Sequence, residues 1–145
     1  MGDSSGNRVF PPSKVTISYM KQKFLEWENK TKLKVTRTAC MPELRRVWIQ
    51  GIVVAADSPV NGKEINDQIV LTIDDGTGTV KVVVDEKDIN HPILSLKGKY
   101  FLVVGNYRLK PDSVEAHQII DLSHQAFRIP LWWLEVIDHQ NLSKE

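Results

Sequence analysis

Two runs of β-branched residues, separated by residues typical of turns, constrain the fold most strongly. The stretch "LTIDDGTGTVKVVV" spans residues 71–84, and its alternating apolar side chains are Leu71, Ile73, Val80, Val82 and Val84. Alternation with a period of two is typical of strands that bury one face. The residues between the runs include Asp74, Asp75, Gly76 and Gly78. Because Asp and Gly adopt turn conformations with little strain, they predict a structural turn that joins two antiparallel strands.

The order of the predicted strands indicates a small closed barrel. Strands are expected near residues 45–56, 67–74, 79–84, 98–109 and 113–121. The first of them, "RRVWIQGIVVAAD", is apolar on both faces and carries Gly51 in its middle, which predicts a bend or bulge. Such a strand can pair on both sides of a barrel. Three strands, a short helix or irregular link over 86–96, and two more strands therefore predict an all-β, five-stranded barrel.

A helix is expected on each side of the barrel. Thr16 or Ser18 is predicted to cap a helix that runs to about Glu28, and Pro130 is a favoured first residue for the second helix. Residues 32–39 predict a short edge strand. We expect residues 1–13 to form a flexible tail and residues 14–145 to form one domain, because this length suffices for a single core.

Composition narrows the class of protein. The 145 residues are 41% hydrophobic and 26% charged, with a net charge of +1, as in a soluble globular protein without electrostatic bias toward nucleic acid or membranes. No apolar stretch approaches the ~18 residues of a membrane span, and the first residues lack the apolar core of a signal peptide. Cys40 is the single cysteine, which favours a reducing compartment. We therefore expect an intracellular protein.

Catalytic and metal sites find little support. Gly76 and Gly78 lead into a strand rather than a helix, and no Gly-Lys-Ser/Thr follows, which argues against a phosphate loop. Asp74 and Asp75 are adjacent, so along a strand they point to opposite faces, and no acidic cluster completes an oxygen cage. The four histidines share no metal-ligand spacing, and a lone cysteine is typical of a small buried side chain. We predict no catalytic residue, no metal and no cofactor.

Direct nucleic-acid binding is also weakly supported. Five-stranded barrels with this strand order are often oligonucleotide-binding (OB) folds. The strands predicted at 67–74 and 79–84 contain no aromatic residue, and each missing base-stacking platform forfeits roughly 1–3 kcal/mol. Basic residues concentrate between positions 30 and 46. This segment is either a solvent-exposed face or a contact for DNA, and the sequence does not distinguish the two. We expect weak or no direct DNA binding.

The last helix carries more apolar surface than one barrel needs. Its apolar residues spread over more than half of a helical wheel, and they are Leu131, Trp132, Trp133, Leu134, Val136, Ile137 and Leu142. A helix that covers a single barrel needs an apolar stripe of only ~100°. Either both tryptophans pack on the protein's own barrel and first helix, or the surplus binds a partner. We favour the partner, because Trp is enriched at interaction hot spots.

The helical wheel also predicts which side chains face outward. Glu135, Asp138 and His139 form the polar strip, and Trp132 lies beside Val136 at its border. This position predicts that Trp132 contacts a third protein. Trp133, Leu134 and Ile137 lie deeper in the apolar arc, so we expect them to face a partner domain or the protein's own barrel.

Four stretches together resemble a known family. They are "RRVWIQGIVVAAD", "LTIDDGTGTVKV", "LKGKYFLVVGNYR" and "QIIDLSHQAFRIPLWWLEVID". The "VWIQG" strand, the "GKY" segment and the "DLS" segment, with a Trp nine residues after its Ser, are the most specific parts. From about Arg45 to Asp138 the sequence resembles the RecQ-mediated genome instability protein 2 family, an OB-fold subunit related in shape to the middle subunit of replication protein A.

The resemblance implies a nuclear adaptor. Its OB domain and C-terminal helix would pair with an OB domain at the end of the larger RMI subunit. Together they would accompany topoisomerase III and a RecQ helicase in dissolving double Holliday junctions. Family members also bind a peptide of the Fanconi M translocase at that interface, with the Trp that matches Trp132, whereas a family Lys is replaced here by Gln118. The alternative is a single-stranded DNA-binding OB subunit of a replication or telomere complex.

Overall fold

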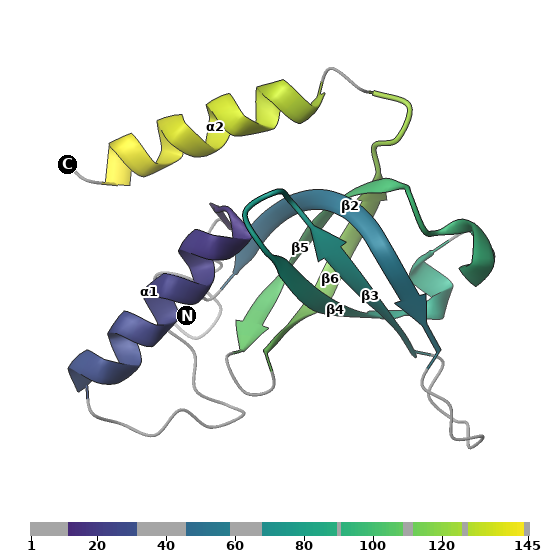
Figure 1. Ribbon diagram of the computed structural model, residues 1–145, viewed down its shortest axis with the longest axis horizontal. Coiled ribbons are helices and arrows are strands. Elements are labelled where there is room, and N and C mark those ends of the chain that lie inside the picture. Colours follow the sequence, from purple (N-terminus) through teal and green to yellow (C-terminus); the bar gives the residue numbers. More distant parts are fainter. Residues whose placement is uncertain are drawn as a thin grey trace, which may run out of the picture.

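A computed structural model describes residues 12–31, 46–58, 68–89, 91–108, 112–125 and 128–143. The helices and strands in chain order are β1 (Ser13–Lys14), α1 (Ile17–Thr31), β2 (Val47–Asp57), β3 (Gln68–Asp74), β4 (Thr79–Asp85), β5 (Tyr100–Arg108), β6 (Ser113–Asp121) and α2 (Arg128–Ser143). Two 3-10 turns, η3 (Glu86–Asp88) and η4 (Ile93–Ser95), lie between β4 and β5. Figure 1 shows the strands wrapped into a barrel, with α1 at one end and α2 across the outside.

The barrel closes because β2 pairs on both of its edges. Residues 47–52 of β2 pair antiparallel with β5, and residues 52–57 pair antiparallel with β3. The ladder continues from β3 to β4, then in parallel to β6, and returns through β6 to β5. The prediction of an all-β, five-stranded OB-fold barrel with an N-terminal and a C-terminal helix is confirmed.

Gly51 lies where β2 passes from one partner strand to the other. A Cβ at this position would lie 2.7 Å from the carbonyl oxygen of Asp74 and 2.7 Å from Cγ2 of Ile73. The glycine is therefore needed for the close approach of β3. The bulge that we predicted at Gly51 occurs two residues later, where the register of β2 with β3 shifts between Val53 and Ala55.

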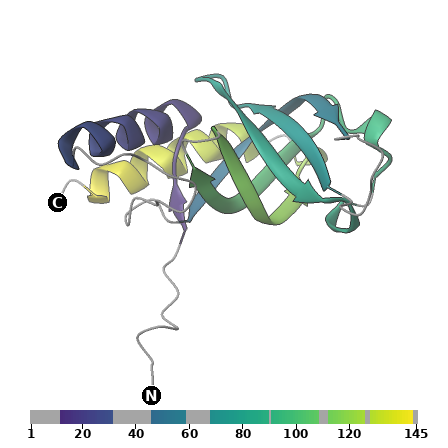
Figure 2. The same ribbon diagram turned by 90° about the horizontal axis from the view of Figure 1, so that it is seen from below.

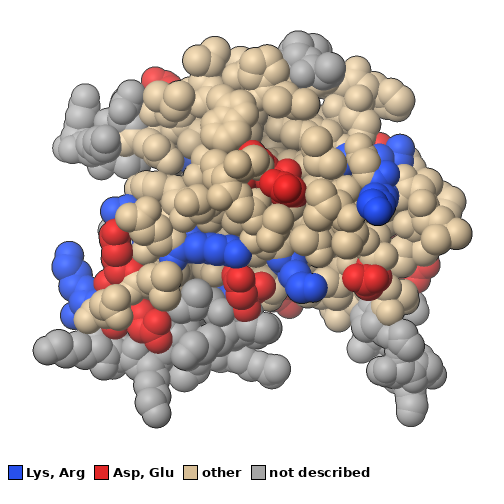
Figure 3. Space-filling view, in the orientation of Figure 1, with Lys and Arg blue, Asp and Glu red and all other residues tan. Residues whose placement is uncertain are grey.

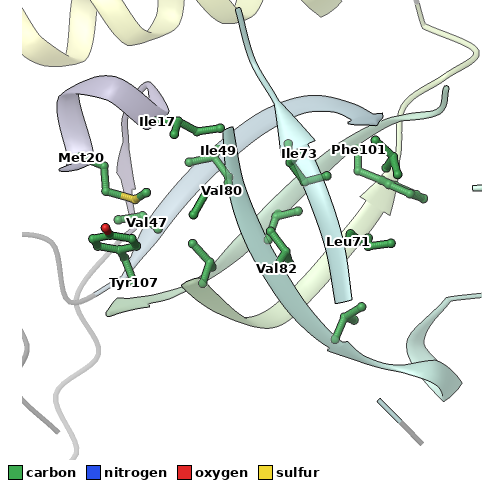
Figure 4. Packing of buried hydrophobic residues seen from close by; sticks show 14 of the residues in the cluster. Ile17, Met20, Val47, Ile49, Leu71, Ile73, Val80, Val82, Phe101 and Tyr107 are labelled. Carbon is green, nitrogen blue, oxygen red and sulfur yellow. The ribbon is translucent and has the colours of Figure 1, made fainter. Parts of the chain in front are cut away.

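The core fills the barrel and continues under α1. The alternating apolar residues of β3 and β4 point inward as predicted: Leu71, Ile73, Val80, Val82 and Val84 are all buried. Ile17 and Met20 of α1 cover one end of the barrel (Figure 4), and Phe24 belongs to the same core cluster. The Phe24 ring packs edge-on against Tyr107 with centroids 4.8 Å apart. Burial, together with a 2.7 Å hydrogen bond to Asp112, raises the pKa of the Tyr107 hydroxyl far above its usual value.

The predicted link over 86–96 is irregular rather than one helix. It contains η3 and η4, and it sends Ile89 and Leu96 into the core. The strand bounds agree with the predicted ones to within about two residues. Ser13, predicted as the last residue of the tail, instead pairs with Val47 in β1. Residues 1–11 and the edge strand predicted at 32–39 lie outside the described residues, and the division into tail and single domain stays a prediction.

Both helices extend to the same side of the barrel, as Figure 2 shows, but they bury different amounts of themselves. The inner face of α1 is part of the main core. The second helix lies on the outer surface of the sheet, over a separate and smaller apolar cluster. The outer surface of the sheet, together with α2, is therefore the candidate functional site.

Candidate protein-binding surface

The sheet presents an apolar outer face beneath α2. Tyr100, Leu102 and Val104 alternate along β5 and, with Leu122, form a buried cluster against which Trp48 of β2 packs. These side chains point away from the barrel interior, because neighbouring strand residues point to opposite faces. Large apolar side chains outside a barrel need a cover, and α2 is the cover that the chain supplies.

Trp132 anchors α2 to this face. Its ring stacks on Trp48 with centroids 6.0 Å apart and an interplanar angle of 20°. Trp132 and Val136 are each only 2% exposed. The Nζ atom of Lys14 lies 4.6 Å from the Trp48 ring centroid and 3.4 Å from Oε1 of Glu135, so a cation joins β1, β2 and α2. A half-exposed ion pair of this kind contributes little by itself, whereas burial of the aromatic rings contributes most of the docking energy.

The predicted exposure of Trp132 at the border of the polar strip is therefore wrong, whereas the expectation that Trp133, Leu134 and Ile137 face a partner stays a prediction. Trp132 does not lie at an exposed border but packs on the protein's own barrel, and Val136 lies beside it on the buried face. The helical wheel placed Glu135 in the polar strip. In the structure, the stack of Trp132 on Trp48 fixes which side of α2 faces the barrel, and Glu135 lies close enough to Lys14 of β1 to form an ion pair.

The opposite side of α2 is apolar and uncovered. Pro130, Trp133, Leu134 and Ile137 form what we call the outer stripe, with the i, i+3, i+4, i+7 spacing of one helix face. Leu134 is 65% exposed and Ile137 is 52% exposed, while Trp133 is half-buried. Leu131, which was also predicted to bind a partner, is exposed at the edge of the polar side. Figure 3 shows few charged atoms over this part of the molecule.

Two indole N–H groups are buried between α2 and the sheet. Neither Trp48 Nε1 nor Trp132 Nε1 has a hydrogen-bond partner among the described residues. An unpaired buried donor costs free energy, so the helix is held by shape and apolar contact rather than by polar pairing. Hydrogen bonds therefore help less to fix the position of α2 on the barrel than they help to fix α1.

The "GKY" and "DLS" segments meet at the start of α2's connection. The backbone N–H of Tyr100 donates to the Ser123 hydroxyl at 3.0 Å, and the N–H of Leu122 donates to the Tyr100 carbonyl at 2.8 Å. Asp121 accepts from the Ser123 N–H at 2.8 Å. These bonds fix the direction in which the chain leaves β6 toward α2.

Asp121 is also the centre of a small charged cluster. Its Oδ2 lies 3.1 Å from Nε2 of His91 and 4.0 Å from Nζ of Lys99. Burial opposes ionisation, but the hydrogen bonds from Ser123 and the nearby positive charges outweigh it and hold the pKa of Asp121 below its usual value. The ionised Asp121 can therefore keep accepting the Ser123 N–H and hold the turn after β6.

Gln118 lies apart from the outer stripe. It is exposed on β6, where it pairs in the ladder with Val104. The predicted partner-binding set is thus divided among three places: Trp132 and Val136 on the inner face of α2, Trp133, Leu131 and Ile137 on its accessible sides, and Gln118 on the sheet.

The turn of Asp74, Asp75, Gly76 and Gly78 joins β3 to β4 as predicted, and it also caps α1. Gly76 takes a positive φ of 91°, and its N–H donates to Asp74 Oδ1. Asp75 Oδ2 accepts the N–H of Ile17 at 2.8 Å, and the Thr77 hydroxyl accepts the N–H of Ser18 at 3.1 Å. The first two N–H groups of α1 are thus bonded by a turn far along the chain.

Thr16 completes this cap, as the sequence predicted, by accepting the N–H of Tyr19 at 3.2 Å. The contribution of the turn was not predicted, because no local pattern connects residues 58 positions apart. The only available signal was a turn with two carboxylates, which suits the positive end of a helix dipole.

A groove lies between the first turns of α2, the middle of β2 and the β3–β4 turn. Its volume is about 400 Å³, and Ile52, Val54, Ile129 and Trp133 contribute apolar walls. Asp74 and Asp75 line one end. Figure 3 shows acidic atoms just below α2, where Figure 1 places this turn.

Among the described residues, no three His, Cys, Asp or Glu side chains come together as metal ligands. Cys40 and most of the basic 30–46 segment lie outside the described residues. Within the part of the chain that the structure describes, no helix has the length and apolar character needed to span a membrane.

Solved structures with the same fold include telomere-capping proteins. The chain is 18% identical to a chain in the crystal structure of yeast Stn1 and Ten1, with a TM-score of 0.67 over 90% of this chain and 73% of that one. A chain in the S. pombe Stn1–Ten1 complex is 22% identical, with a TM-score of 0.57 over 70% and 75%. Both likenesses show the OB fold alone. No curated protein matches the sequence.

The sequence model of RecQ-mediated genome instability protein 2 matches residues 11–140, which include the barrel and most of α2. The match thus covers the strands, the "GKY" and "DLS" segments that meet beside α2, and the outer stripe itself. The chain belongs to the RecQ-mediated genome instability protein 2 family.

Proposed function

We propose that the protein is a non-enzymatic OB-fold adaptor that forms a heterodimer with the larger RMI subunit, through the C-terminal OB domain of that subunit. The observation that carries the proposal is the outer stripe of α2. Its four apolar positions have the spacing of one helix face: Pro130, Leu134 and Ile137 are exposed, with Leu134 at 65%, while Trp133 is half-buried beside the β3–β4 turn. An uncovered apolar helix face of this kind is typical of a helix that packs on a partner.

Within this proposal the heterodimer supports topoisomerase III and a RecQ helicase in dissolving double Holliday junctions, and thereby DNA repair and genome stability in the nucleus. Family membership supports this role. Within this proposal the protein contributes a binding surface rather than catalysis to the complex.

A Fanconi M-type peptide is a further proposed partner. Gln118, at the position of a family Lys, is exposed on β6 and is free to contact a peptide from the sheet surface. Its carboxamide is neutral, so it offers hydrogen bonds where a Lys would offer a charge. We expect a weaker preference for acidic peptides than a Lys at this position would give.

Co-expression with the larger RMI subunit tests the heterodimer. Leu134→Glu and Ile137→Glu place charges on the outer stripe without touching the buried Trp132, so both variants should fold and lose co-purification. Leu94→Glu is the matched control, because Leu94 is 94% exposed on η4, away from α2. Retention of the larger subunit by both stripe variants would contradict the proposal.

The second candidate is a single-stranded DNA-binding OB subunit, which the fold shared with chains of Stn1–Ten1 structures favours. The outward side chains of β3 and β4 argue against it, because Val70, Thr72, Lys81 and Val83 offer no aromatic platform. Titration of a labelled 30-nucleotide oligonucleotide decides between them. Tight binding by the protein alone at physiological salt would favour the second candidate.

A further inference from the structure

The groove beside α2 has apolar walls that the chain leaves open. Ile52 and Val54 of β2 and Ile129 of α2 are exposed there, although each is a large aliphatic side chain. The volume of about 400 Å³ falls within the roughly 300–1,000 Å³ typical of sites that hold a ligand. The space therefore suits one or two bulky apolar side chains.

The polar groups at the bottom of the groove are paired with each other. The Tyr100 hydroxyl donates to Oε1 of Gln50 at 3.0 Å, and both side chains are buried. Because this bond is already made inside the protein, an apolar ligand group can cover it without breaking it. Apart from the indole N–H of Trp132, which lines the groove and has no acceptor among the described residues, the polar groups at the bottom do not exclude an apolar side chain.

The acidic end of the groove is held in place but not neutralised by a cation. Backbone N–H groups of the turn donate to the carboxylates of Asp74 and Asp75 at 2.8 Å and fix their positions. Among the described residues, neither carboxylate forms an ion pair with Lys, Arg or His. Asp75 already accepts the first N–H of α1 and faces the positive end of that helix, whereas Asp74 is bonded only within the turn among the described residues, so its negative charge beside an apolar pocket favours a positive charge on the occupant.

We propose that this groove binds a short segment of another protein in which a bulky apolar residue lies within two positions of a Lys or Arg. The apolar side chain enters between Val54 and Ile129, and the cation lies against Asp74. Trp133 belongs both to the groove and to the outer stripe, so a segment here continues the surface of α2. The inference goes beyond the proposed heterodimer and does not depend on the identity of the partner on α2.

Selection from a random peptide library displayed on phage tests the proposal with the full chain as bait. Enriched peptides should carry the apolar–basic pair. Val54→Arg fills the groove with a cation, and Ile129→Arg does the same from α2. Each should weaken binding of a selected peptide at least tenfold, while a thermal melt checks that the variant is folded. Asp74→Asn should weaken it about fivefold, the size expected for one ion pair in water, with a further loss in high salt.

Two controls separate this site from the outer stripe. Leu94→Arg adds the same charge far from the groove and should leave peptide binding unchanged. Leu134→Glu should remove the larger RMI subunit but not the peptide, so failure of either proposal is recognised separately. Enrichment of acidic or uncharged peptides, binding that survives both Val54→Arg and Ile129→Arg, or no enrichment at all would overturn the inference.

Discussion

The two helices of this protein are attached to the same barrel in different ways. Ile17, Met20 and Phe24 of α1 enter the main core, and a turn from the far side of the sheet bonds its first N–H groups. In contrast, α2 rests on the outer face through Trp132 and Val136 and leaves its outer stripe uncovered. We therefore regard α1, whose apolar face and first N–H groups are satisfied within the chain, as a structural helix. We expect α2, whose outer stripe stays exposed, to bind a partner.

Phe24→Ala should produce the largest effect and should weaken the barrel itself. The ring is fully buried and packs edge-on against Tyr107, so its loss should lower the free energy of unfolding by about 3–5 kcal/mol. Urea denaturation measures the change. Leu25→Ala, on the exposed side of the same helix, should change stability by less than about 1 kcal/mol. Similar losses in both variants would show that α1 is not anchored as described.

Trp132→Ala should detach α2 while the barrel stays folded. Loss of the stack on Trp48 should cost about 3 kcal/mol of docking energy. Amide hydrogen exchange should then rise along α2 and stay slow in β2 and β5. Trp133→Ala is the matched change on the accessible side and should leave exchange in α2 nearly unaltered. If Trp133→Ala loosens α2 and Trp132→Ala does not, our assignment of the two faces fails.

Asp75→Ala should be more harmful than Asp74→Ala, although the two residues are neighbours. Asp75 accepts the first N–H of α1, so its loss should cost about 1–2 kcal/mol, as for other helix caps. Asp74 accepts only the Gly76 N–H within the turn, so its loss should cost about 1 kcal/mol or less. Thermal denaturation of both variants measures the difference. Equal effects would mean that the turn is not part of the α1 cap.

The smallest expected effect is on the stability of the fold at acidic pH. The pKa of Asp121 is lowered in the folded protein, so its ionised form stabilises the fold at pH values above the ordinary Asp pKa of about 3.9. This contribution should disappear as the pH falls through the lower, folded-state pKa. Asp121→Asn should flatten the dependence of stability on pH in that acidic range. An unchanged slope in urea denaturation series would contradict the lowered pKa.

Much of the fold was predictable because its signals are local. The alternation around residues 71–84 and the central Gly51 indicated a barrel, and the strand bounds agree closely. The orientation of α2 was not predictable from a helical wheel, because it depends on the contact of Trp132 with Trp48, which lies on β2 far away in the sequence. The cap of α1 by Asp75 was missed for the same reason. Contacts between distant segments decide these details, and a single sequence does not display them.

The affinity of the C-terminal OB domain of the larger RMI subunit for this protein tests the central claim most directly. Calorimetric titration of the wild type, Leu134→Glu and Leu94→Glu compares the uncovered face of α2 with an even more exposed leucine elsewhere. The account predicts that Leu134→Glu weakens binding by about 100-fold or more, as for a hot-spot residue, and that Leu94→Glu matches the wild type. Equal affinities for all three proteins would contradict it.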